Sequence, residues 1–364
     1  MNIKIDGHVY NPLGGASYMF EKETIPYILM NYTKNVIKIS VGAQINSSPH
    51  FGTLETIALS YALAKRIEEY DENKKVIILY EIIETAPGET IIIDNVKYQK
   101  NLVSSGVLDN YIDEYKEILN YYTKITGIKH EIRYQCEFNN SVEIKGIVRK
   151  IIKEKDYISK RLDPKHNNLR LRCSCPICGL TDKNCVKNRY LNDEIYFMCP
   201  VHGEYKIDIE SECYKLEYNS PYRNLIRGMM YTKINNSDLY DYQILRITGS
   251  DYAGFYQEEM RYKLASYLGM DISRMSIIFY APLVCDWSGA KMSKSLYVQK
   301  GAYKDIPREF ISYSFLREKY GEYGLEILFN IVLNWVDNPF MLFRAYSIYY
   351  FIEEFKKYET SNIC

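Results

Sequence analysis

The chain has 364 residues and equal numbers of basic and acidic side chains, 46 of each, so its formal net charge is zero. This length can bury a sizeable core and predicts two or three domains, whereas the charge balance excludes a globally basic nucleic-acid-binding protein. No membrane span is expected, because asparagine, aspartate and proline interrupt the apolar stretch at 325–351. Lys4 and Asp6 break the first apolar run, so no signal peptide is expected. Nine cysteines, several in close pairs, favour metal binding in a reducing cytoplasm over disulfides.

The first predicted element is a buried strand over residues 36–44, which is almost entirely apolar. From Leu54 onward, apolar residues recur with the spacing of one buried helix face. Residues 50–53, His-Phe-Gly-Thr, lie at the start of this helix, where free N–H groups attract phosphate. Thr53 is alternatively suited to be the N-cap of the helix.

A second buried strand is predicted over residues 75–83, and it ends in a loop over residues 85–89. Glu81 and Glu84 lie at its carboxyl end, where ligands of parallel sheets bind. Their carboxylates are expected either to bind the amino group of an amino acid or to face water. An amphipathic helix over 108–126 and a strand over 131–138 complete the first half of a doubly wound sheet.

The stretch from Glu143 to Arg172 is basic, with ten lysines and arginines against four acidic residues. Much of it is predicted to be helical. It is either an ordinary solvated helix face or a surface that meets the phosphates of an RNA acceptor end.

Two ligand pairs on tight turns follow. The first pair is Cys175 and Cys178, and the second is Cys199 and His202. A glycine, which gives the backbone more freedom, follows each pair. Four nitrogen and sulfur ligands form the set that zinc prefers, and with no open position the metal is expected to be structural. A strand over 194–198 is predicted between the pairs. Cys173 or Cys185 remains able to replace one ligand.

The second half of the sheet is predicted to contain strands over 243–248 and 276–281. Between them, the turn Gly249-Ser250-Asp251 offers a carboxylate to vicinal hydroxyls and a glycine that permits close approach. Tyr256 is expected to line a substrate pocket or to belong to the core. Residues 289–295, Gly-Ala-Lys-Met-Ser-Lys-Ser, have the lysines and hydroxyls needed to close over a polyphosphate.

Residues 291–295 read Lys-Met-Ser-Lys-Ser, and together with residues 50–53 they resemble the two signatures of class I aminoacyl-tRNA synthetases. The resemblance spans about residues 36–300 and implies an α/β fold with a doubly wound, Rossmann-like parallel sheet, an inserted zinc ribbon and a helical C-terminal stem. It implies His50, Lys291 and Lys294 as catalytic residues. It also implies ATP contacts by Gly52, Thr53, Gly249, Asp251, Ile278, Ser293 and Ser295, and substrate contacts by Gln44, Glu81, Glu84 and Tyr256. Thr53 departs from the family, which usually has histidine at this position.

The implied domains are 1–159 and 218–304 for the two halves of the catalytic unit, 160–217 for the zinc ribbon and 305–364 for a helical region. The order of these parts is nearest to class I lysyl enzymes, so lysine is weakly favoured. The implied reaction is ATP-dependent amino-acid activation with Mg²⁺, followed by transfer to a tRNA 3′ end in the cytoplasm. Few residues follow the lysine loop, which favours an alternative, a paralogue with a non-tRNA acceptor. A third alternative is a non-catalytic zinc-ribbon RNA-binding module.

Overall fold

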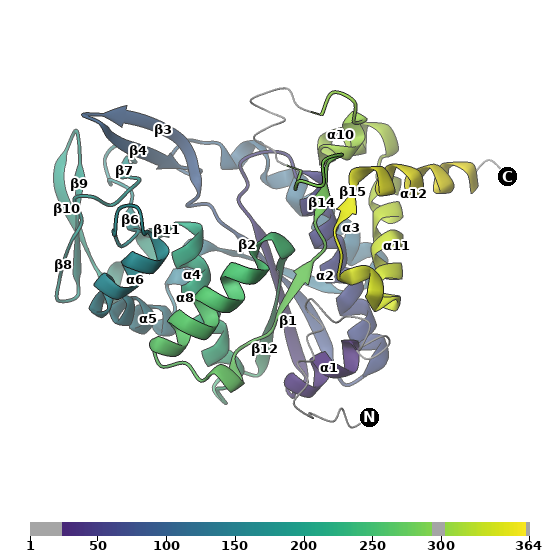
Figure 1. Cartoon of the computed structure of the whole chain (residues 1–364), viewed down its shortest axis with the longest axis horizontal. Helices are drawn as coiled ribbons and strands as arrows, with labels where there is room; N and C mark the ends of the chain where they lie inside the picture. Colours follow the sequence, from purple (N-terminus) through teal and green to yellow (C-terminus); the bar gives the residue numbers. More distant parts are fainter. Residues whose placement is uncertain (1–23, 293–302, 362–364) are drawn as a thin grey trace.

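A five-stranded, wholly parallel sheet forms the centre of the protein, as predicted (Figure 1). The computed structural model describes residues 24–292 and 303–361. Across the sheet the order is β13-β12-β1-β2-β5. The strands are β1 (Val36–Ala43), β2 (Lys75–Ile82), β5 (Lys129–Tyr134), β12 (Tyr242–Gly249) and β13 (Ile278–Ala281).

The strand order reverses between β1 and β12. From β1 the chain adds β2 and β5 on one side, and it later adds β12 and β13 on the other. Ligands of open α/β sheets bind beyond the carboxyl ends of the strands at such a switch point. Gly42, near the end of β1, has to be glycine because a Cβ there would lie 2.3 Å from the Glu81 carbonyl oxygen on β2.

Helices cover both faces of the sheet. Ile37, Ile39 and Val41 of β1 belong to the apolar cluster that contains α2 (Phe51–Tyr70), α3 (Ile112–Thr126) and α11 (Tyr323–Asp337). The opposite face contacts α8 (Ser220–Asn235), whose outer side packs against α5 (Val142–Lys153) and a π-helix, η5 (Phe255–Ala265). Side chains alternate between the two faces along each strand, so each face receives its own set of residues.

Between β2 and β12 the chain builds the region on the left of Figure 1. It contains three small sheets, β3-β4-β7, β6-β11 and β8-β9-β10. Their strands are β3 (Pro87–Ile93), β4 (Val96–Asn101), β6 (Leu171–Cys173), β7 (Thr181–Asp182), β8 (Arg189–Leu191), β9 (Glu194–Cys199), β10 (Gly203–Asp208) and β11 (Leu216–Tyr218). The helices of this region are α4 (Gln135–Asn139), α6 (Lys155–Leu162) and α7 (Ile209–Glu212).

Three sequence predictions are wrong in detail. The predicted loop over 85–89 runs into β3 of an antiparallel hairpin, where Asp94 and Asn95 adopt positive φ at the turn. The predicted strand over 131–138 ends at Tyr134, because α4 begins there with a capping box formed by Tyr134 and Glu137. The helix expected from Leu54 begins three residues earlier, at Phe51.

The C-terminal helices pack against the sheet unit and share the apolar cluster of α2. They are α10 (Tyr313–Tyr320), α11 and α12 (Ile348–Ser361), and the first helix of the described chain, α1 (Thr24–Asn31), also contacts α2. β15 (Tyr346–Ser347) in this region pairs in parallel with β14 (Val284–Cys285), the short strand that follows β13. Within the described residues, every helix is too short or too polar to span a lipid bilayer.

Candidate active site and candidate metal centre

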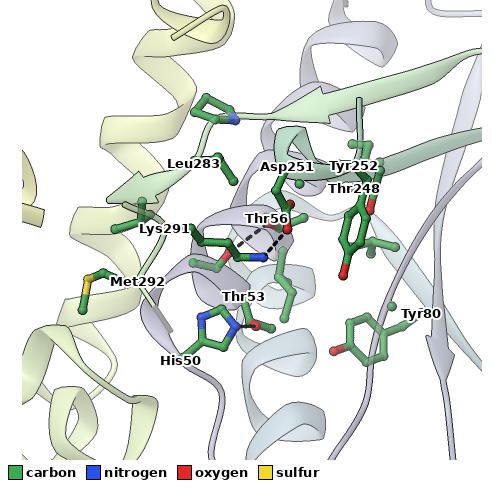
Figure 2. A pocket seen from close by; sticks show the side chains of 18 residues that line it. His50, Thr53, Thr56, Tyr80, Thr248, Asp251, Tyr252, Leu283, Lys291 and Met292 are labelled. Atoms are coloured by element: carbon green, nitrogen blue, oxygen red, sulfur yellow. Dashed lines mark hydrogen bonds and ion pairs between the residues drawn. The ribbon is translucent and has the colours of Figure 1, made fainter. Parts of the chain in front are cut away.

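Two adjoining cavities lie at the carboxyl ends of β1 and β12. The first, called here the lysine cavity, has a volume of about 150 Å³ and is shown in Figure 2. Its walls come from the strand ends, the first turn of α2 and the segment after β13. They include Gly42, His50, Gly52, Thr53, Thr56, Thr248, Gly249, Asp251, Tyr252, Leu283, Lys291 and Met292.

His50 is placed by the start of α2. It is the N-cap residue in extended conformation, so Thr53 is not the N-cap but lies in the first turn. The His50 imidazole Nε2 lies 3.1 Å from the Thr53 hydroxyl, and both side chains face the cavity (Figure 2). The N-terminus of a twenty-residue helix carries positive partial charge, which favours an anion in this cavity.

Lys291 reaches the same cavity from the opposite wall. A tight turn with Gly289 at φ +80° and a bond from the Met292 N–H to the Val284 carbonyl (2.9 Å) bring it there. Its ammonium lies 2.5 Å from the Asp251 carboxylate, as Figure 2 shows. Gly249 permits this arrangement, because a Cβ there would lie 2.7 Å from an Asp251 carboxylate oxygen. Lys294, Ser293 and Ser295 lie outside the described residues.

The second cavity, called here the arginine cavity, has a volume of about 300 Å³. It shares Gly42, His50, Thr53, Thr248 and Tyr252 with the lysine cavity, so the two are continuous along one wall. The predicted substrate residues Gln44 and Tyr256 line it. Its other lining residues include three arginines, Arg223 and Arg227 on α8 and Arg246 on β12.

Glu81 is the buried carboxylate beneath these arginines, and it does not line either cavity. Its side chain is 3% exposed and is held by Arg133 and by Arg227, whose Nε lies 2.7 Å away. Burial alone would raise the pKa of Glu81, but Arg227 and Arg133 bring it down to about 2. The carboxylate is therefore ionised at neutral pH and engaged within the protein.

Two other residues expected to contact ligands also lie elsewhere. The Glu84 carboxylate accepts bonds from the backbone N–H groups of Gln135 (2.7 Å) and Cys136 (2.8 Å), at the start of α4. Ile278 is buried in β13 and lines neither the lysine cavity nor the arginine cavity.

Sequence reasoning missed the arginine cluster. Strands buried on both faces of a parallel sheet are normally apolar throughout. Ser40 on β1, Glu81 on β2 and Arg246 on β12 interrupt such strands, and Ser40 pairs in register with Arg246. Polar residues in the interior of three adjacent, otherwise apolar strands were the available signal for this polar site.

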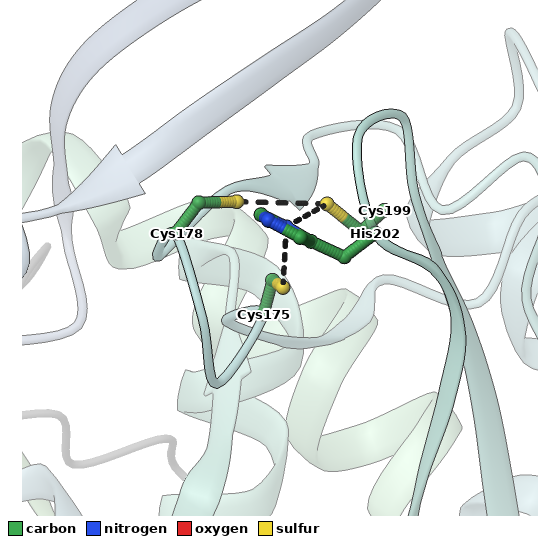
Figure 3. A group of neighbouring side chains, drawn as sticks. All are labelled: Cys175, Cys178, Cys199 and His202. Carbon is green, nitrogen blue, oxygen red and sulfur yellow. Dashed lines mark hydrogen bonds between the residues drawn. The ribbon is translucent and has the colours of Figure 1, made fainter.

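The four predicted zinc ligands form one cluster (Figure 3). The ligand atoms of Cys175, Cys178, Cys199 and His202 all lie within 4.8 Å of one another. The Cys178 and Cys199 sulfurs are 3.5 Å apart, and His202 Nδ1 lies 3.7 Å from the Cys175 sulfur. Tetrahedral zinc with bonds of about 2.3 Å to sulfur separates its ligands by about 3.8 Å. The cluster therefore has the donor set and spacing to hold a metal ion such as zinc.

The geometry also settles which sulfurs belong to the cluster. Gly179 follows Cys178, and Gly203 follows His202. Both glycines adopt positive φ, which lets the chain turn tightly directly after the second ligand of each pair. Cys173 and Cys185 are buried outside it and direct their thiols toward the carbonyls of Ser174 and Leu171. The eight cysteines among the described residues are all free.

Four of the ten lysines and arginines in the basic stretch are engaged in ion pairs. Lys145 and Arg149 contact Glu210 at 3.0 and 2.8 Å, and Arg161 contacts Glu259 at 2.6 Å. Arg170 is buried against Asp163 at 2.7 Å. All of these acidic partners except Asp163 come from distant parts of the chain, and they neutralise part of the local excess charge.

Neither protein-family models nor curated proteins match this chain. Solved structures that resemble it include glutamate-tRNA synthetase from Elizabethkingia anophelis, at 12% identity and TM-score 0.39, covering 84% of this chain and 65% of that one. A glutamate tRNA ligase from Elizabethkingia meningosepticum, in complex with its amino acid, matches at 12% identity and TM-score 0.37, covering 82% and 60%. A putative arginyl tRNA synthetase from Campylobacter jejuni matches at 11% and 0.36, covering 86% and 68%.

The matched part spans less than two thirds of both glutamate enzymes.

Proposed function

We propose that this protein activates an amino acid with ATP, forming an aminoacyl adenylate and pyrophosphate. One observation carries the proposal. His50, from the loop after β1, and Lys291, from the turn after β14, line the same cavity at the switch point of a doubly wound sheet. Gly249 and Asp251 line that cavity as well. This is the set of residues that the sequence resemblance assigns to a triphosphate and its ribose.

The proposed reaction needs only groups that bind and neutralise phosphate. The amino-acid carboxylate attacks the α-phosphorus of ATP, a new P–O bond forms, and the bond from the α-phosphorus to the bridging oxygen breaks. Pyrophosphate leaves with the electron pair, and no proton needs to move. Catalysis is therefore positioning plus charge stabilisation. His50 and Gly52 receive the phosphates at the start of α2, while Lys291 neutralises the leaving group.

Asp251 is assigned to the ribose hydroxyls, and here it contacts the Lys291 ammonium. The two side chains are 24% and 44% exposed, and such solvent-exposed pairs contribute at most about 1 kcal/mol. ATP can therefore separate them at little cost, freeing the ammonium for phosphate. Mg²⁺ would accompany the nucleotide and supply further charge neutralisation. The second lysine of the loop, Lys294, keeps its proposed role on the phosphates.

The test is amino-acid-dependent exchange of pyrophosphate into ATP, screened over the twenty amino acids. We expect exchange with at least one of them, and a reduction of about 100-fold or more in Lys291→Ala and in His50→Ala. Absence of exchange together with absence of ATP binding at millimolar concentration would refute the proposal. Aminoacylation of tRNA, measured next, separates a synthetase from a paralogue that uses another acceptor. Nothing in the comparisons supports the preference for lysine.

A further inference from the structure

The arginine cavity carries more positive charge than the protein itself neutralises. Arg223, Arg227 and Arg246 line it. Arg133, on β5, contacts the same carboxylate as Arg227, that of Glu81. Glu81 is the single carboxylate that contacts any of these four within the described residues. Four cations against one anion leave three positive charges around a cavity of about 300 Å³.

The positive charge of Arg223 is not neutralised by any carboxylate contact among the described residues. Its side chain is only 3% exposed, and its guanidinium donates to the Tyr218 carbonyl (3.2 Å) and the Ser220 hydroxyl (3.0 Å). The buried Nε has no hydrogen-bond partner among the described residues. Burial, together with the neighbouring Arg227, lowers the pKa of Arg223 to about 9. A guanidinium held this way lacks an anionic partner.

Arg246 is similar. Its Nη2 donates to the Asn224 side-chain oxygen at 2.8 Å, while its Nε has no partner among the described residues. Asn224 in turn donates to the Tyr256 hydroxyl, and the Tyr256 ring stacks on Tyr252 with centroids 4.7 Å apart. These neutral contacts fix the guanidinium in place without neutralising it. A guanidinium fixed in this way is ready to donate two parallel hydrogen bonds to a carboxylate or phosphate.

From this we infer that the arginine cavity binds an anionic side chain, so the amino acid that this protein activates is an acidic one, with a carboxylate or phosphate beyond its α-carbon. The inference rests on the proposed function for the statement that the ligand is an amino acid. The wall shared with the lysine cavity places the α-carboxylate near His50 and the side-chain anion near the arginines. A lysine side chain would bring a fourth uncompensated positive charge into the same space.

The experiment measures binding to the full chain by calorimetry at fixed ionic strength. L-Aspartate, L-glutamate and O-phospho-L-serine are compared with L-asparagine, L-glutamine and L-lysine. We expect at least one acidic amino acid to bind about 10-fold or more tightly than its amide or lysine. Binding should fall about 30-fold or more in Arg223→Met, because a partner of a buried charge pair is lost.

Further arginine variants separate the effect of charge near the cavity from effects of charge elsewhere and of guanidinium geometry. Arg66→Met removes a positive charge at the other end of α2, where Arg66 pairs with Asp337, and should bind the acid as the wild type does. Arg246→Lys keeps the positive charge but loses the planar guanidinium that can donate two parallel hydrogen bonds, so intermediate binding is expected. Arg223→Met should also melt at a higher temperature than the unliganded wild type, since it removes an uncompensated buried charge.

Three results would overturn the inference. One is equal or tighter binding of an amide or of lysine. Another is a folded Arg223→Met variant that binds the acid as the wild type does. The third is a wild type that binds no acidic amino acid. If an acid binds but supports no pyrophosphate exchange, the proposed reaction fails while the anion site stands. If exchange occurs with a neutral or basic amino acid, the reaction stands and the anion site fails.

Discussion

The parallel sheet and the Cys–His ribbon are held together by different forces. Ile39, Ile78 and Leu245 on the sheet are fully buried between helix layers. The ribbon consists of the sheet β8-β9-β10 and the turn between β6 and β7. Its sheet buries Ile195, Phe197 and Ile207, and at the β9–β10 turn Cys199 and His202 meet Cys175 and Cys178 of the other turn. Apolar burial scales with area, and short strands cannot supply much of it. The ribbon is therefore expected to depend on its metal, whereas the sheet is not.

Removing a metal ligand should have the largest effect. Cys199→Ser should abolish stoichiometric metal binding and unfold the ribbon, because structural zinc contributes about 10–16 kcal/mol in small domains. Metal content by mass spectrometry and amide hydrogen exchange check this: protection should fall in β9 and β10 and persist in β1 and β12. Cys136→Ser, outside the cluster, is the matched control. Loss of protection in β1 as well would mean that the two regions fold as one unit.

Glu81 tests the charge balance within the sheet. Glu81→Gln should destabilise the protein by about 3–5 kcal/mol, because Arg133 and Arg227 lose their buried anion. The folded-state pKa of about 2 is below the ordinary value of 4.5. This stabilisation is therefore complete above pH 4.5 and is lost as pH falls toward 2. Urea unfolding of both proteins between pH 3 and 7 should show a difference that grows with pH. A constant difference would contradict the assignment.

Glu55 provides the opposite pH dependence. Its side chain on α2 is 1% exposed, and one carboxyl oxygen has no partner among the described residues. Burial raises its pKa well above 4.5, so the folded state binds the proton more tightly than the unfolded state does. The stability that this proton contributes is complete below pH 4.5 and declines as pH rises toward the folded-state pKa. Glu55→Gln should gain about 1–3 kcal/mol relative to wild type at pH 8, and almost none at pH 4.

Thermal unfolding of the wild type and Glu55→Gln across this range is the measurement. Glu72→Gln, at an exposed position just after the same helix, should show no such trend. A Glu55→Gln variant that is less stable than the wild type at pH 8 would contradict the raised pKa.

Lys291→Ala should change stability least. The exposed pair with Asp251 is worth about 1 kcal/mol or less, so the melting temperature should move by only a few degrees. If the same variant loses pyrophosphate exchange, the cavity is functional and not structural. A large drop in melting temperature would instead make the lysine a structural residue.

Local patterns predicted much of this structure. Apolar runs located β1, β2 and β12 to within a residue or two, because buried parallel strands are apolar throughout. The spacing of the cysteines and His202 predicted the metal cluster, because both turns are local structures. The β3–β4 hairpin was missed, since its alternation is weak and its Asp94-Asn95 turn lacks glycine. The ion pairs of the basic stretch could not be predicted from the sequence, because partners such as Glu210 and Glu259 are distant along the chain.

The sequence by itself determined the order of the strands along the chain, the metal ligands and the presence of His50 and Lys291 near predicted strand ends. Only the tertiary structure decided that these two side chains line one cavity, and that Glu81 neutralises Arg133 and Arg227 instead of facing a ligand. The arginine cavity likewise appears only when α8 lies across β12. Motifs are encoded by local spacing, whereas the charge of a cavity is the sum of side chains that only folding brings together.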